Sequence, residues 1–111
     1  MNGDSWGIDP HVRYMRKVFS SMEKAQRELL DDLGITLLDE RLRRFREIAL
    51  ALFEKAWPVA MQRGLTRDEG DAASLYVHCL SRALASRGIQ VPNDKLPDRE
   101  RIAPLIKEIL A

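Results

Sequence analysis

The sequence contains a single cysteine and almost no excess of charge of either sign. Cys79 has no second cysteine to pair with, and the opening segment MNGDSWGIDP lacks the basic start and apolar run of a secretory signal. We therefore expect a cytoplasmic protein. Eighteen basic residues against seventeen acidic ones leave a formal net charge of +1, so the chain as a whole has no electrostatic attraction for nucleic acids or anionic membranes.

Long hydrophobic runs and catalytic motifs are also lacking. The apolar run from Ile48 to Phe53 is far shorter than the ~20 residues that span a bilayer. No glycine-rich phosphate loop, paired acidic ligand motif or dinucleotide fingerprint occurs. We therefore predict no membrane insertion, no cofactor and no metal, and the sequence does not favour an enzyme.

The glycines are few, but three of them recur in the same setting. Gly34, Gly64 and Gly88 each follow a segment with helical periodicity and precede an apolar residue. Glycine adopts the left-handed conformation that ends a helix, and the apolar residue after it can pack back on the last helical turn. The residues available for that packing are Leu30, Ala60 and Leu84. Each glycine therefore predicts the end of a helix.

These stops divide the 111 residues into helices of predictable length. We predict long helices over 10–33, 37–63 and 67–87 and a short one over 98–110, with an N-terminal arm at 1–9 and a loop at 88–97. Thr36 and Thr66 are placed to cap the helices that follow them. The short connections predict antiparallel neighbours. The fold class we expect is all-α, a single domain (1–111) formed by an antiparallel bundle of three long helices plus a short C-terminal helix.

The first and third helices carry apolar arcs that predict the core. In the first helix Gln26 falls inside the arc, where we expect an edge position or a satisfied hydrogen bond. In the third helix Cys79 lies at the centre of the arc, where we predict that it is a small core residue. The arcs comprise Val12, Met15, Val18, Phe19, Met22, Ala25, Leu29, Leu30 and Leu33 in the first helix, and Ala72, Leu75, Tyr76, Cys79, Leu80 and Ala83, widened by Ala73, Val77 and Leu84, in the third.

The second helix is apolar over about 200° because it carries two stripes. One stripe predicts the core. The other consists of Leu50, Phe53, Trp57 and Met61, and Arg43 and Arg46 continue it. Packing within the chain is one explanation for the second stripe, and a protein partner or a second copy of this chain is the other. We predict a non-catalytic protein-interaction module, such as a small adaptor, an accessory subunit or a homodimer, that binds through this second stripe.

Two alternative functions stay open at this stage. Arg41, Arg43, Arg44 and Arg46 lie close together, which is compatible with a helical nucleic-acid-binding regulator, although Asp39, Glu40 and Glu47 are placed to pair with them. Pro58 predicts a bend or restart of the second helix, beside which a pocket for a small molecule could form.

The third helix places Asp71, Ser74 and His78 on one polar side. Their spacing resembles that of a hydrolase triad, but a regular helix offers neither an oxyanion hole nor a sharply presented nucleophile. We therefore expect a hydrated polar face here. His78 and the adjacent Cys79 point about 100° apart, so we do not expect them to bind one metal ion.

Overall fold

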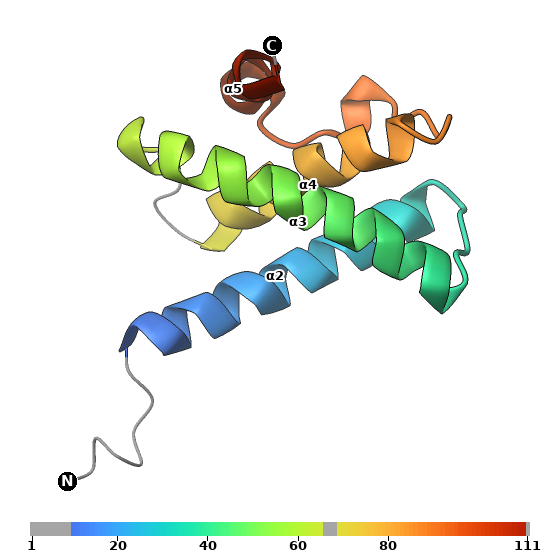
Figure 1. The fold of residues 1–111 in the computed structure, drawn as a ribbon, viewed down its shortest axis with the longest axis horizontal. Helices are drawn as coiled ribbons and strands as arrows, with labels where there is room; N and C mark the ends of the chain where they lie inside the picture. Colours follow the sequence, from blue (N-terminus) through green and yellow to red (C-terminus); the bar gives the residue numbers. More distant parts are fainter. Residues whose placement is uncertain (1–9, 66–68, 111) are drawn as a thin grey trace, which may run out of the picture.

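The computed structural model describes residues 10–65 and 69–110, with side chains over 16–65 and 70–110. In this part the chain forms four α-helices, α2 (Pro10–Asp32), α3 (Asp39–Gln62), α4 (Glu69–Ala85) and α5 (Arg99–Leu110), and one short 3-10 turn, η1 (Asn93–Lys95). The described residues form no strand, and the three long helices alternate in direction (Figure 1). The predicted all-α antiparallel arrangement is confirmed. The predicted N-terminal arm lies outside the described residues.

The three glycine stops are confirmed in detail. Gly34, Gly64 and Gly88 have φ values of 68°, 71° and 85°, in the left-handed region that side chains with a Cβ rarely adopt. After each glycine the next amide donates a hydrogen bond across the last turn to the carbonyl five residues before it. These bonds run from Ile35 to Leu30 (3.0 Å), from Leu65 to Ala60 (2.9 Å) and from Ile89 to Leu84 (3.0 Å).

The start of α3 differs from the prediction. The helix begins at Asp39 rather than at residue 37, and the position before it, Leu38, makes no capping hydrogen bond with its side chain. Thr36 is therefore not the cap, and its assignment was wrong. Asp39 and Glu40 in the first turn instead stabilise the helix start through their negative charge. Thr66 lies outside the described residues.

Helix α4 is the centre of the fold. It packs along α3 on one side and along α2 on the other, whereas α2 and α3 have far fewer close backbone contacts with each other. Ala49, Ala56 and Ala60 of α3 are completely or almost completely buried, and such small residues allow close packing between helices. As Figure 1 shows, α2 and α3 are near each other at the loop that joins them and separate toward the first turn of α2 and the last turn of α3.

Helix α5 covers the remaining side of α3 and α4. Ile102, Leu105 and Ile106 are buried, and Ile109 packs against the core. Pro104 lies within α5 without ending it, and Pro58 likewise lies within the continuous α3. Arg63 at the end of α3 donates a hydrogen bond of 2.8 Å to Glu108, which holds the pKa of Glu108 below its usual range. Among the described helices, none combines the length and the hydropathy needed to cross a bilayer.

Candidate functional site

The six residues predicted to form a binding face lie along α3 on the side that faces α2. Arg46 locates this side, because its guanidinium lies 3.6 Å from the carboxylate of Glu23 on α2. Leu50 and Trp57 are partly buried, and Met61 is 54% exposed. Arg43 is exposed, and it has no ion pair or hydrogen bond among the described residues. Exposure along this row is therefore greatest at its two ends.

Phe53 differs from the other five residues because it is only 6% exposed. Its ring centroid lies 5.0 Å from that of Trp57 and 6.4 Å from that of Tyr76 on α4, with the second pair in an edge-on arrangement. Both distances fall in the range of favourable aromatic pairs. Phe53 thus belongs to the core and supports Trp57 from below, but it presents almost no surface to a partner.

A buried polar contact joins α2 and α4 beneath this row. The hydroxyl of Tyr76 donates a hydrogen bond of 2.6 Å to Oε1 of Gln26, and both side chains are buried. Gln26 therefore has the satisfied hydrogen bond that the sequence analysis allowed for. Burial raises the pKa of Tyr76 to about 12, while nearby Arg46 acts in the opposite direction. The Tyr76 hydroxyl consequently stays protonated at neutral pH and serves as a hydrogen-bond donor.

Between α2 and α3, close to the connecting loop, the surface forms an open groove of about 410 Å³. Leu30, Ile35, Leu37 and Leu42 supply apolar walls, and Gln26 and Arg46 also line it. A second hollow of about 460 Å³ adjoins Arg43 and Arg46. Sequence periodicity does not predict this groove, because it forms from residues of two helices and a loop whose relative positions depend on α4. Pro58 lines neither of these hollows, nor any of three others on the described part of the chain.

Phe19 on α2 is the functional candidate that sequence periodicity missed. It falls within the apolar arc predicted for the core, yet it is 48% exposed. The sequence carries one signal for this, since Glu23 lies one turn later on the same side of the helix. The edge of the apolar arc that contains Phe19 thus faces away from α4.

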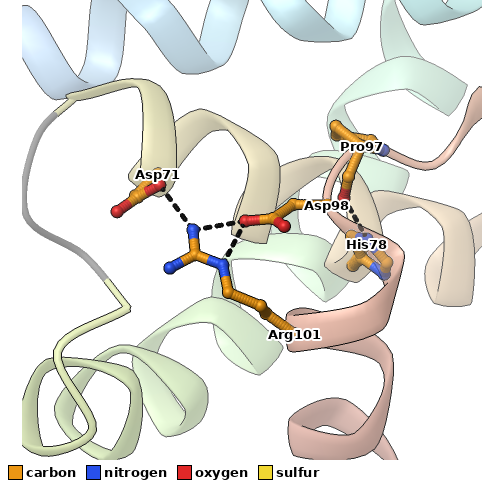
Figure 2. A network of polar contacts seen from close by, with 5 residues as sticks. All are labelled: Asp71, His78, Pro97, Asp98 and Arg101. Carbon is orange, nitrogen blue, oxygen red and sulfur yellow. Dashed lines mark hydrogen bonds and ion pairs between the residues drawn. The ribbon is translucent and has the colours of Figure 1, made fainter.

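Asp71 and His78 of α4 are engaged in structural contacts (Figure 2). His78 is 4% exposed rather than hydrated, and its Nε2 lies 2.8 Å from the carbonyl oxygen of Pro97, to which it donates. Asp71 accepts a hydrogen bond of 3.0 Å from Arg101 of α5, which also binds Asp98 through Nε at 2.7 Å. The expected hydrated face was therefore wrong for His78. Asp71 and His78 have separate partners and do not form a catalytic pair.

Cys79, the residue of α4 that could bind a soft metal ion, also has a structural role. Cys79 has no exposed surface, and burial raises the pKa of its thiol to about 12, so the reactive thiolate is scarcely populated at neutral pH. Cys79 is a core residue, as predicted. No group of three or more histidine, cysteine or acidic side chains in the described part of the chain is arranged to hold a metal ion.

The arginine-rich first half of α3 is partly neutralised by neighbouring carboxylates. Arg44 lies 3.6 Å from Glu40 one turn earlier, and Arg46 pairs with Glu23 of α2. Arg44 therefore has one of its predicted partners, whereas Glu23, the partner of Arg46, was not predicted.

Comparison of the chain with protein-family models, with curated proteins and with solved structures finds no match.

Proposed function

We propose that this chain is a non-catalytic protein-interaction module that binds its partner through the α3 face, defined as Leu50, Trp57 and Met61 with Arg43 and Arg46 at its N-terminal end. The observation that carries the proposal is the exposure of Met61, at 54%, in one row with the partly exposed Trp57 and Leu50. Methionine and tryptophan are enriched in interface cores.

The support beneath Trp57 makes this face suited to binding. Trp57 lies against Phe53, whose own ring is fixed in the core. A side chain that is already held in place loses less conformational entropy on binding than a freely rotating one. Trp57 is therefore the anchor of the face, and Met61 adapts to the partner through its flexible thioether.

The two arginines contribute orientation rather than most of the affinity. Arg43 is exposed and has no partner among the described residues, so its guanidinium is available to a carboxylate on the incoming protein. Charges at the rim of an interface steer association and select against wrong orientations.

A photo-cross-linking experiment in cells that express the chain tests the proposal. A benzophenone amino acid replaces Met61 in one version, and Lys55 in the control version, because Lys55 is exposed and lies about 120° around α3 from Met61. We expect a discrete intermolecular adduct from position 61, its loss when Trp57→Glu is added, and no such adduct from position 55.

Circular dichroism of Trp57→Glu separates a lost partner from a lost fold. If Trp57→Glu does not fold, Arg43→Glu serves as the second variant, since Arg43 is exposed. The absence of any adduct from position 61, or the same adducts from both positions, would overturn the proposal.

A further inference from the structure

The side of α2 that faces α3 can be traced from its contacts. Glu23 contacts Arg46 of α3, and Gln26 and Leu30, one and two turns later, line the groove between the two helices. Phe19 lies one turn before Glu23 on the same side. It therefore continues the α3-facing row of α2, and at 48% exposure it is not covered by the rest of the chain.

The matching row on α3 runs in the opposite direction from the same contact. Starting at Arg46, it continues through Leu50 and Trp57 to Met61, which is 54% exposed. Figure 1 shows that α2 and α3 separate from the loop that joins them toward the first turn of α2 and the last turn of α3. Phe19 of the α2 row and Met61 at the end of the α3 row keep exposed surface.

Charges of opposite sign flank the two rows, apart from the basic Arg43 and Arg46 at the N-terminal end of the α3 row. Arg16 and Arg27 flank the row of α2, and Glu47 and Glu54 flank the row of α3. All four side chains are exposed, and none has an ion pair or hydrogen bond among the described residues. We call Arg16 and Arg27 the basic pair, and Glu47 and Glu54 the acidic pair.

A second copy of this chain is the partner that matches both faces at once. Because α2 and α3 diverge within one chain, their complementary rows cannot close on each other. A two-fold axis places the α2 row of each copy against the α3 row of the other and creates two identical contacts. Apolar residues then meet apolar residues, and the basic pair of one copy meets the acidic pair of the other.

We infer that two copies of this chain form a symmetric dimer in which the α2 row of each copy packs on the α3 row of the other, with Phe19 against Trp57, flanked by contacts between the basic and acidic pairs. This inference rests on the proposed function, because it names the partner of the same α3 face.

Charge reversal with sedimentation equilibrium tests the pairing. One variant carries Arg16→Glu and Arg27→Glu, a second carries Glu47→Arg and Glu54→Arg, and a third combines all four changes. We expect the wild type to approach twice 12.7 kDa at high concentration. Each of the first two variants raises the dimer dissociation constant about tenfold, and the combined variant returns it to within about threefold of the wild type.

The matched control carries Lys17→Glu and Lys24→Glu, which make the same change of charge about 100° around α2 from Arg16 and about 60° from Arg27, farther from the α3-facing row. We expect the control to dimerise like the wild type. A mass that stays at 12.7 kDa at every concentration overturns the dimer. The pairing is also overturned if the combined variant does not recover, or if the control weakens the dimer as much as reversal of the basic pair.

The cross-link from position 61 keeps this inference separate from the proposed function. An adduct between two copies of the chain, with its second attachment point on α2, supports both. An adduct with a different protein overturns the dimer and leaves the proposed function standing. A cross-link to residues 1–9 of the same chain overturns both, because the α3 face would then be covered by its own N-terminal segment.

Discussion

Helices α4 and α2 use their surfaces in different ways. Every residue from Leu75 to Leu80 of α4 is buried, because α4 is packed on several sides. In α2, burial recurs at Val18, Met22, Gln26 and Leu29, the spacing of a helix covered on one side. Periodicity identifies most of the buried residues of both helices, but it errs in opposite directions. It misses the buried His78 of the central helix, and it counts the exposed Phe19 of the outer helix as core.

Removing side-chain volume from α4 should have the largest effect on stability. Leu80 has no exposed surface, so Leu80→Ala leaves a cavity that its surroundings fill only in part. We expect a loss of about 2–5 kcal/mol in the free energy of unfolding, measured by urea denaturation. Leu38 is 76% exposed, and Leu38→Ala is the matched control, with an expected change within about 0.5 kcal/mol. Equal losses in both variants would contradict the central position of α4.

The polar contact between the two helices should have the next largest effect. Tyr76→Phe removes the hydroxyl that donates to Gln26 and leaves the buried Oε1 without that donor. We expect a loss of about 1–3 kcal/mol in the free energy of unfolding. The double variant Tyr76→Phe with Gln26→Leu removes both polar groups and should recover part of the loss. If the double variant is no more stable than Tyr76→Phe alone, the cost lies in packing and not in the hydrogen bond.

The burial of His78 in α4 should make the stability of the protein depend on pH. Burial lowers its pKa, although the hydrogen bond to Pro97 and the charge of Asp98 act in the opposite direction. Between the lowered folded pKa and the unfolded value of about 6.5, the unfolded chain binds a proton that the folded chain does not. The free energy of unfolding should therefore decrease as the pH falls below about 6.5.

Urea denaturation of the wild type and of His78→Gln over this pH range measures that contribution. We expect the variant to show a weaker dependence on pH than the wild type. Identical pH dependence in the two proteins would mean that His78 is not responsible.

The smallest effects should come from the surface ion pairs that attach α5. Arg101 bridges Asp71 of α4 and Asp98 at the start of α5 (Figure 2), and its side chain is 43% exposed. Solvent weakens such pairs, so Arg101→Ala should lower the stability measured by thermal or urea unfolding only slightly, and by less than Tyr76→Phe. Arg44→Ala, which removes a more exposed pair within α3, should cost still less. A large loss for Arg101→Ala would show that α5 depends on this bridge more than on its buried isoleucines.

Much of the fold and part of the site could be predicted from local sequence. Gly34, Gly64 and Gly88 fixed the ends of three helices because a left-handed residue and one apolar contact act within a few positions of each other. Cys79 was placed correctly because it lies at the centre of its arc, where burial does not depend on the precise neighbour. Phe53 was predicted to lie on the same face as Trp57. The two residues occupy slightly different positions around α3, so the ring of Phe53 lies in the core and that of Trp57 is partly exposed.

Local sequence patterns are enough to predict where the helices end, that they run antiparallel, and that α3 is more apolar than one neighbour can cover. Which part of that apolar surface stays exposed depends on how the helices pack. The exposure of Phe19 and Met61 follows from the divergence of α2 and α3, and the volumes of all the side chains packed on α4 set that divergence together. No local sequence pattern predicts this divergence, because it depends on residues that are distant in the sequence and meet only in the folded chain.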